Sequence, residues 1–189
     1  MYKRQLLHGT GGNEEDLIPL GKELASNASI LSVRGKVLEN GIPRFFRRIK
    51  EGVFDLEDLN LRTNELADFI LNSSSIYEFD PERIIAVGFS NGANIGASLL
   101  LGRPEVLTGA ILFRAMVPFI PKVPPDLSKK LILLSEGLHD PIVSRGEAEN
   151  LLRLFTKARS DATLKWQDSG HNLVQQDIVA SRKWLERNF

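Results

Sequence analysis

The sequence predicts an α/β protein in which helices cover both faces of a mostly parallel sheet. Short apolar runs alternate along the chain with longer segments in which apolar residues recur at helical spacing. This alternation is typical of a parallel sheet, because two parallel neighbours need a crossover connection that is usually a helix. The length of 189 residues favours one domain, so we expect a single domain over residues 1–189.

The elements follow from these patterns in order. Apolar runs predict strands at about residues 4–8, 29–33, 83–88, 109–114, 130–135 and 162–167. Helical spacing predicts helices at 56–72, 147–158 and 172–187, and a further helix directly after residue 92. Asn13, which precedes three acidic residues, predicts the N-terminus of the first helix. The long connections 34–55 and 116–130 both follow strands, so we expect them at the carboxyl edge, where open α/β sheets bind ligands.

Composition narrows the class of protein. The chain is 42% hydrophobic and 25% charged, which is ordinary for a globular domain with one core. The formal net charge of zero gives no indication of a nucleic acid or an anionic membrane as partner. The chain has no cysteine, which excludes thiol nucleophiles, disulfides and thiolate metal sites. No residue cluster indicates a metal or cofactor, and no apolar run is long enough to span a membrane. We therefore expect a cytoplasmic protein. Both a monomer and a homodimer fit these observations.

The N-terminal residues do not fit the pattern. Leu6 and Leu7 look like the end of a buried strand, but the polar residues 1–5 do not continue its apolar pattern. We interpret residues 1–5 as a sequence foreign to the natural protein, which we expect to begin further upstream and to have at least one more strand. A genuine short start is the alternative. If the first interpretation is correct, the chain as it stands should be of low stability or solubility.

Residues 88–92 read Gly-Phe-Ser-Asn-Gly, preceded by the apolar run 84–87 and followed by a helical segment. This is the G-x-S-x-G motif in a strand–turn–helix context, which is typical of a nucleophilic serine at a sharp turn. The flanking glycines allow a close approach that side chains would block. The five-residue match alone is weak, so a glycine-rich turn without chemistry is the alternative. The residues that follow in the chain favour Ser90 as a nucleophile.

A serine nucleophile needs a base and an acid that orients it. In proteins with this motif the acid and then the histidine follow the serine along the chain. Only His139 and His171 follow Ser90, and His171 lies beside a glycine after the last predicted strand. Asp140 lies at the end of the strand 130–135 and is the first candidate for the acid. Glu136 and Asp168 are reserve candidates for the acid. We interpret His139 as a neighbour of the acid and His171 as the base.

The glycine-rich loop 8–12 follows the first predicted strand. Its backbone N–H groups, together with the N–H of Asn91, can form an oxyanion hole. A phosphate-binding loop is the alternative, but neither the P-loop pattern nor the G-x-G-x-x-G spacing is present.

Four motifs together resemble the phospholipase/carboxylesterase family of small α/β-hydrolases: HGTGGNE at 8–14, GFSNGAN at 88–94, DPIV at 140–143 and GH at 170–171. Segments 34–48 and 52–55 are similar to a bacterial subgroup associated with tolerance of hydroquinone and catechol compounds. The resemblance, which covers about residues 6–189, implies an α/β-hydrolase fold and the triad Ser90, Asp140 and His171. It also implies that Thr10 and Asn91 donate to the oxyanion.

The long connections predict a substrate pocket. Aromatic and apolar residues there could line a slot for an acyl chain or an aromatic ring, and nearby arginines could bind an anion of the substrate. The first candidates are Phe45, Phe46, Arg47, Met116 and Phe119. Further candidates are Phe54, Arg34, Arg44, Arg48 and Arg114. Ordinary packing and ion pairing are the alternatives. The sequence predicts a serine hydrolase of small carboxylic esters or thioesters, acting through an acyl-enzyme. One alternative is a protein of the same fold that binds a small ligand without turnover. Another is C–C bond hydrolysis or acyl transfer, which would use the same residues.

Overall fold

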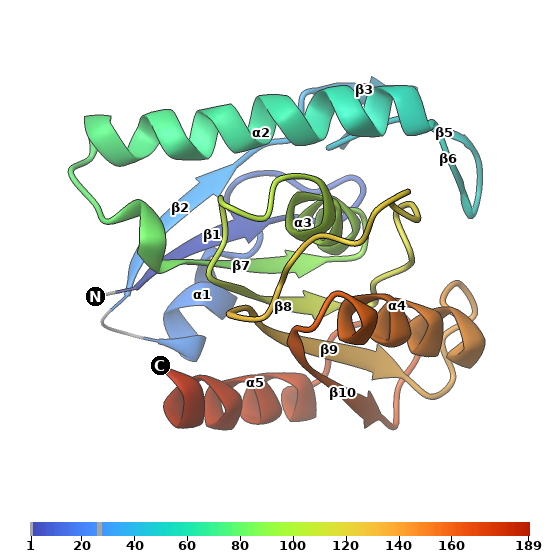
Figure 1. Ribbon diagram of the computed structural model, residues 1–189. Coiled ribbons are helices and arrows are strands. Elements are labelled where there is room, and N and C mark those ends of the chain that lie inside the picture. The colour runs from blue at the N-terminus through green and yellow to red at the C-terminus, as the bar shows by residue number, and fades with distance from the viewer. Residues whose placement is uncertain (1, 26–27) are drawn as a thin grey trace.

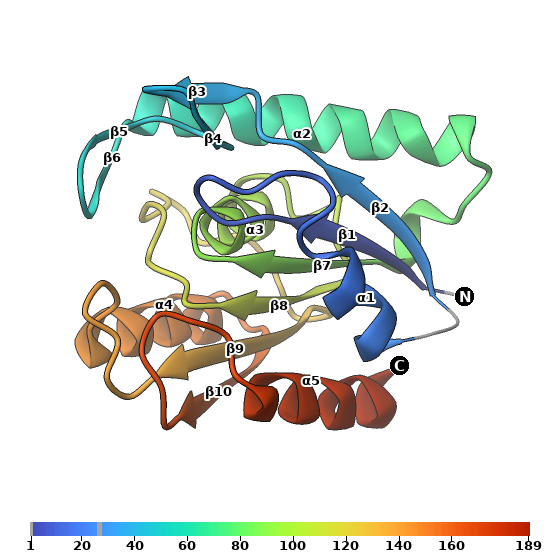
Figure 2. The same cartoon turned by 180° about the vertical axis from the view of Figure 1, so that it is seen from behind.

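A central sheet of six parallel strands organises the computed structural model, which describes residues 2–25 and 28–189. The strand order across the sheet is β10-β9-β8-β7-β1-β2 (Figures 1 and 2). Every pair of neighbours in it is parallel. Its strands are β1 (Lys3–Leu7), β2 (Ser29–Val33), β7 (Ile84–Phe89), β8 (Gly109–Phe113), β9 (Leu131–Gly137) and β10 (Asp161–Gln167). The predicted strands are therefore all present, with ends that differ by one or two residues.

Helices cover both faces of the sheet, as the sequence predicted (Figure 1). They are α1 (Ile18–Leu24), α2 (Leu56–Ile76), α3 (Asn91–Gly102), α4 (Arg145–Lys157) and α5 (Gln175–Asn188), with a short 3-10 turn at Pro81–Arg83. α2, α3 and α4 lie on one face, and α1 and α5 lie on the other, as the two opposite views agree (Figures 1 and 2). No helix in the described ranges is long and apolar enough to cross a membrane.

Two apolar clusters, one on each face, form the core. β7 shows why, because its residues alternate between them: Ile84 and Ala86 belong to the cluster under α2, α3 and α4, and Ile85 and Val87 to the cluster under α1 and α5. A strand buried on both faces is continuously apolar because successive side chains point to opposite faces. The sheet is thus held between two layers of helices, and its carboxyl edge stays open for loops.

β1 lies between β2 and β7 and carries polar side chains into the core. Leu6 and Leu7 are fully buried, as expected. Arg4 and Gln5 are buried as well, and Arg4 Nε and Nη1 and Gln5 Oε1 have no hydrogen-bond partner. Lys3 pairs in register with Ser29 and Ile84, so the polar residues continue the strand although their pattern did not predict it.

Some helix ends differ from the prediction. Asn13 does not cap α1. Its Oδ1 accepts the N–H of Glu15 at 2.7 Å in a turn, and the helix begins only at Ile18. A hydrogen bond from a side-chain oxygen to the N–H two residues later competes with a helix cap, because both use the same oxygen. α5 begins at Gln175, three residues later than the predicted 172, because residues 168–174 form an irregular loop.

The two long connections differ in structure. Residues 34–55 form two antiparallel pairs beyond the carboxyl edge, one of β3 (Val37–Glu39) with β4 (Ile42–Arg44) and one of β5 (Arg48–Lys50) with β6 (Val53–Phe54). Residues 114–130 contain neither helix nor strand. The strands of the sheet all point to the same edge (Figure 1). Both long connections therefore begin at this edge, beside the loops that follow β1, β9 and β10. The functional candidates are gathered at this edge.

Candidate active site

Ser90 occupies a strained turn between β7 and α3. Its backbone has φ 52° and ψ −114°, a region that residues with a side chain rarely adopt, and its N–H donates to the carbonyl of Phe113 at 2.9 Å. A Cβ at Gly88 would lie 2.6 Å from the carbonyl oxygen of Gly92, and a Cβ at Gly92 would overlap the carbonyl of Leu7. The two glycines of the motif therefore let α3 pack directly against β1 and β7 and hold Ser90 at the tip of the turn.

Ser90, His171 and Asp140 form one hydrogen-bonded series. Ser90 Oγ lies 2.9 Å from His171 Nε2, and His171 Nδ1 lies 2.8 Å from Asp140 Oδ2. The side chain of Asp140 is fully buried, whereas that of His171 keeps 21% of its surface exposed. With Nδ1–H donating to the carboxylate, Nε2 is free to accept the serine proton.

Asp140 is fixed by the turn in which it lies. Its Oδ1 accepts the N–H groups of Ile142 at 2.7 Å and Val143 at 3.0 Å, which leaves Oδ2 for His171. Pro141 between them has no N–H and restricts the turn. The loop after β9 therefore holds the carboxylate in one orientation relative to the imidazole.

The reserve candidates lie elsewhere. His139 Nε2 lies 2.9 Å from Asp168 Oδ1, and both side chains are exposed on the surface. Glu136 is buried, and its Oε1 accepts the N–H of Ala115 at 2.9 Å. Burial raises the pKa of Glu136 well above its ordinary value, although the N–H of Ala115 and the charge of Arg114 act in the opposite direction. None of these three side chains has a hydrogen bond to Ser90, His171 or Asp140 in the structure.

The glycine-rich loop after β1 lies beside Ser90. A Cβ at Gly9 would lie 2.8 Å from the ring of Phe89, the residue that precedes the serine. His8 is buried and its Nε2 accepts the N–H of Gly35 at 3.0 Å. Burial lowers the pKa of His8, which favours the neutral imidazole that this bond requires. The loop is thereby tied to the start of the connection 34–55.

One predicted oxyanion donor, Asn91, directly follows Ser90, and the other, Thr10, lies in the loop after β1. Asn91 is the first residue of α3, where a backbone N–H has no carbonyl partner within the helix. Its side-chain Oδ1 accepts the N–H of Phe45 at 2.7 Å. Thr10 is exposed in the loop after β1, and its Oγ1 accepts from Arg44 Nη1 at 2.8 Å. The side chains of Thr10 and Asn91 are thus both held by the segment 44–45.

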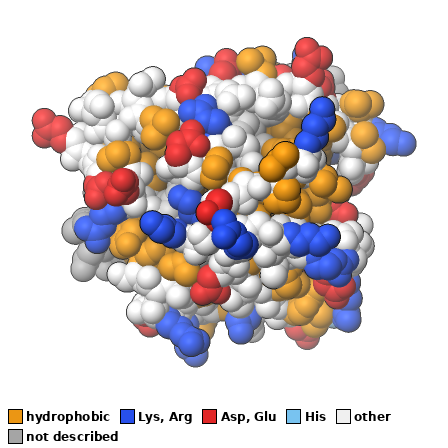
Figure 3. Space-filling model, in the orientation of Figure 1, with side chains coloured by type: hydrophobic (Ala, Val, Ile, Leu, Met, Phe, Trp, Pro, Cys, Tyr) orange, Lys and Arg blue, Asp and Glu red, His pale blue; other side chains and the backbone are white. Residues whose placement is uncertain are grey.

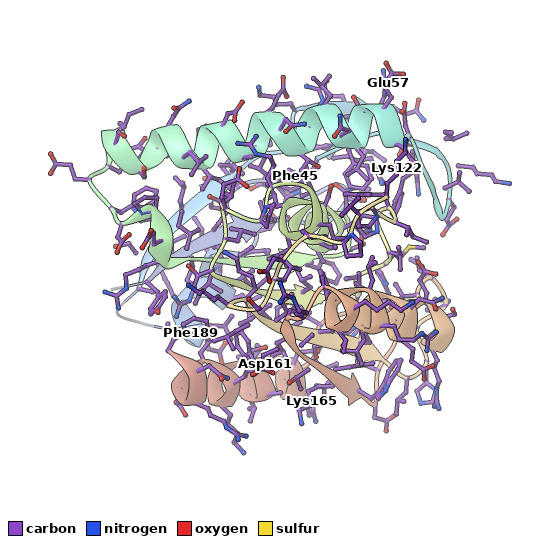
Figure 4. All side chains as sticks on the ribbon, in the orientation of Figure 1. Phe45, Glu57, Lys122, Asp161, Lys165 and Phe189 are labelled. Carbon is purple, nitrogen blue, oxygen red and sulfur yellow. The ribbon has the colours of Figure 1, made fainter. Side chains whose placement is uncertain are left out.

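Only some of the predicted pocket residues lie near Ser90. Phe45 lies beneath α2 (Figure 4), packs on the His8 ring at 4.7 Å and lines a cavity of about 380 Å³ between β2, α2 and α3. Met116 donates its N–H to Asn94 Oδ1 at 2.8 Å, one helical turn from the serine. Phe46 is fully buried against Phe54, with ring centroids 5.0 Å apart.

Phe119 packs against the far end of α3. Its ring contacts Gly102, because a Cβ there would lie 3.7 Å from Phe119 Cζ, and Gly102 is the last residue of α3. The helical rise places that end about 18 Å from Ser90. Composition placed Phe119 in the correct loop, but it could not show along which part of α3 the loop runs.

The predicted arginines have partners within the protein. Arg47 is mostly exposed and pairs with Asp55 at 3.3 Å and Asp58 at 3.7 Å. Arg114 is fully buried against Asp177, which excludes the proposed contact with a substrate anion. Positive and negative side chains are likewise interspersed on the face shown in Figure 3. No cluster of three or more His, Cys, Asp or Glu residues suited to a metal lies within 2–25 and 28–189.

The sheet order, the sharp turn at Ser90 and the bonded serine, histidine and aspartate define an α/β-hydrolase. The chain belongs to the phospholipase/carboxylesterase family, whose model matches residues 50–188. It is 48% identical over 181 residues to MhqD of Bacillus subtilis (strain 168), a hydrolase by name, with 96% of this chain and 90% of that protein covered.

Solved structures of similar proteins have the same fold. The crystal structure of the Bacillus cereus carboxylesterase superposes with a TM-score of 0.98 at 46% identity, covering 100% of this chain and 89% of that one. The structure of YahD with malic acid superposes with a TM-score of 0.94 at 29% identity, covering 100% and 94%. These similarities confirm the predicted fold and family, and they make the chain a hydrolase of the carboxylesterase type.

Proposed function

We propose that the protein is a serine hydrolase that cleaves carboxylic esters or thioesters of small acyl or aromatic groups through an acyl-enzyme. The observation that carries this proposal is the hydrogen-bonded series from Ser90 Oγ to His171 Nε2 and from His171 Nδ1 to Asp140 Oδ2, at 2.9 and 2.8 Å. The first distance is within the range in which a proton is transferred directly between a nucleophile and its base, and the second is that of the hydrogen bond by which the acid orients the base.

In the first half-reaction, Ser90 Oγ attacks the acyl carbonyl while His171 Nε2 takes the hydroxyl proton. The tetrahedral intermediate then breaks its bond to the leaving oxygen or sulfur, which receives that proton from His171. Asp140 holds the imidazole in the required tautomer and stabilises its charged form. The acyl group remains on Ser90 as an ester, and the alcohol or thiol leaves.

In the second half-reaction, a water attacks the acyl-serine and His171 again accepts the proton. Collapse of the intermediate returns the proton to Ser90 Oγ and releases the carboxylic acid. In both steps the N–H groups of Thr10 and Asn91 are the proposed donors to the oxyanion. The N-terminus of α3 lies at the same place, and its dipole favours developing negative charge.

Labelling with a fluorophosphonate tests the nucleophile. We expect the wild-type protein to be labelled covalently and Ser90→Ala to remain unlabelled. Hydrolysis of short p-nitrophenyl esters should fall by about 10⁴-fold or more in Ser90→Ala, because triad residues act as a unit. Ser75→Ala, at an exposed serine in α2, is the matched control and should keep both properties.

The same experiment separates the two classes of function. A wild-type protein that is neither labelled nor active on a chain-length series of p-nitrophenyl esters and an acyl-CoA would show a binding protein without turnover. If Ser90→Ala keeps even a tenth of the wild-type activity, Ser90 is not the nucleophile. The ester series run beside the acyl-CoA also ranks esters against thioesters.

A further inference from the structure

His171 lies on a loop that lacks regular structure. β10 ends at Gln167 and α5 begins at Gln175, and the residues between them form neither helix nor strand. The imidazole contacts Ser90 and Asp140 through its two nitrogens. A loop of this kind is mobile unless its backbone groups are bonded elsewhere. The position of the proposed base therefore depends on what holds the backbone on either side of His171.

A buried guanidinium bonds the loop on both sides of His171. Arg114 Nε donates to the carbonyl of Gly170 at 3.1 Å, and Nη2 donates to the carbonyl of Asn172 at 2.8 Å. Nη2 also donates to Ser169 Oγ at 3.0 Å. The residues immediately before and after the proposed base thus share one donor group, and that group comes from a different strand of the sheet.

The guanidinium is itself fixed. Its Nη1 and Nη2 donate to the two carboxylate oxygens of Asp177 at 3.0 and 2.7 Å, and Nη1 donates to the carbonyl of Ser135 at 2.8 Å. Both side chains of the ion pair have 0% exposure. Asp177 Oδ2 also accepts the N–H of Val174 at 2.9 Å, so the ion pair fixes the end of the same loop. The planar guanidinium with five N–H groups suits this cluster of acceptors, and a lysine could reach only a part of it.

The backbone of Arg114 is adapted to this contact. The residue follows β8, has φ 56° and donates its own N–H to the carbonyl of Ser135 at 3.1 Å. A positive φ is unfavourable for a residue with a long side chain. In this conformation the side chain reaches the carbonyl of Ser135 in β9 and those of Gly170 and Asn172 in the histidine loop. Arg114, directly after β8, is therefore both the first residue of the connection 114–130 and the residue that holds the loop after β10.

We propose that Arg114 is a positioning residue for the hydrolase, which keeps His171 within hydrogen-bond distance of Ser90 by binding the carbonyl groups of Gly170 and Asn172. This inference rests on the proposed role of His171 as the base. Arg114 touches neither the substrate nor the reacting atoms. It acts through the loop alone, so its loss should slow acylation and deacylation, which both use His171, and leave substrate binding nearly unchanged.

The rate per competent site tests this role. Full-length wild type and Arg114→Lys are titrated to completion with a fluorophosphonate, and kcat and KM for p-nitrophenyl acetate are then expressed per labelled site. We expect kcat per site to fall by roughly 10- to 100-fold in Arg114→Lys, as a small misplacement of a catalytic group does. KM should stay within about twofold, because the bonds lost are at the base and not at the substrate pocket.

Two milder variants keep the test open if Arg114→Lys does not fold. Ser169→Ala removes one bond between Arg114 and the loop, and we expect kcat per site to fall by about two- to fivefold. Ser135→Ala is the matched control, because it removes the bonds of Ser135 Oγ to Asp177 at 2.6 Å and from Gln167 Nε2 at 3.2 Å and leaves every contact of the loop with Arg114. Its kcat per site should remain within twofold of wild type, even if its Tm falls.

Three outcomes overturn the inference: an unchanged kcat per site in Arg114→Lys, equal losses in Ser169→Ala and Ser135→Ala, or fewer labelled sites that each retain the wild-type rate. The last outcome would show that Arg114 only stabilises the fold. His171→Ala, measured alongside, distinguishes this failure from that of the proposed function. If His171→Ala stays active, the assignment of the base is wrong, whereas an inactive His171→Ala with a normal Arg114→Lys rejects the positioning role alone.

Discussion

At residue scale, the two histidines after Ser90 differ in their surroundings. His171 joins Ser90 to a buried carboxylate, whereas His139 lies on the surface beside Asp168. We expect His171→Ala to lose about 10⁴-fold in ester hydrolysis, because no other group accepts the serine proton. His139→Ala, the matched control, should keep most of its activity. Steady-state rates of the two variants check this, and the reverse pattern would refute the chosen base.

Gly92 tests the turn that holds Ser90. A Cβ at this position would lie 2.5 Å from the carbonyl oxygen of His8, besides overlapping Leu7. We expect Gly92→Ala to lose about 1–3 kcal/mol of stability through overpacking, which lowers the Tm by roughly 3–10 °C. The activity should fall by about 10²-fold as Ser90 is displaced. Thermal unfolding and initial rates measure the two effects.

Gly146 in α4 provides the control for that substitution. A Cβ there would meet only Ser144 Oγ, at 3.9 Å. We expect Gly146→Ala to stabilise the protein by about 0.5–1 kcal/mol, because glycine is an unfavourable residue within a helix. Equal Tm values for Gly92→Ala and wild type would show that α3 does not pack as closely on β1 as the structure describes.

At the scale of elements, β1 combines a central position with polar residues. Gln5 is fully buried, its Oε1 has no partner, and its Nε2 reaches only the carbonyl of Leu6 at 3.5 Å. A buried acceptor without a partner costs about 1–3 kcal/mol. We therefore expect Gln5→Leu to raise the Tm by roughly 2–10 °C. Gln176→Leu, on the exposed side of α5, is the control and should change the stability by less than about 0.5 kcal/mol. A lower Tm for Gln5→Leu would contradict the stated cost.

Most elements could be predicted from the sequence, because strands buried on both faces are continuously apolar and helices repeat their apolar residues. The ends were less predictable where local side-chain bonds compete with the helix. Asn13 has the composition of a cap but bonds Glu15 in a turn. Residues 34–55 were expected as one long connection, and their short antiparallel pairs are held by contacts with α2, such as the bond from the Arg47 N–H to Asp58 at 2.7 Å.

At the scale of the whole molecule, the candidate site follows from topology. Parallel strands bring their carboxyl ends to one edge, so motifs far apart in sequence, at Ser90, Asp140 and His171, meet there. The role of Arg114 could not be predicted in this way. Its acceptors include the carbonyl groups of Gly170, Asn172 and Ser135, which leave no trace in side-chain composition. Arg114 is also excluded from the substrate pocket because its side chain is buried, and a sequence pattern does not show which arginine is buried.

Glu136 links global stability to pH. Burial raises its pKa well above the ordinary value, so the folded protein keeps a proton that the unfolded chain releases. As pH rises from the unfolded pKa to the folded pKa, the wild type therefore loses stability, by about 1.4 kcal/mol for each pH unit. Glu136→Gln keeps an acceptor for the N–H of Ala115 and has no proton to lose.

We expect the Tm of Glu136→Gln relative to wild type to be constant below about pH 4 and to rise with pH above it. Thermal melts at intervals of one pH unit measure this difference. Glu51→Gln, at an exposed turn, is the control and should show no such trend. A difference that stays constant from acid to neutral pH would mean that Glu136 is ionised in the folded protein.

The hairpins of residues 34–55 also have a consequence for how this enzyme could change. Their anchors include the bonds of Gly35 with His8, Pro43 with Gly11, Phe45 with Asn91 and Arg47 with Asp58. The tip at Asn40 and Gly41, with φ 53° and 81°, takes part in none of these bonds, and a Cβ at Gly41 would meet nothing within 4 Å. New residues can therefore accumulate at the tips while the anchors keep the reaction centre intact. A library restricted to the tip at Asn40 and Gly41 should therefore keep the hydrogen bonds among Ser90, His171 and Asp140.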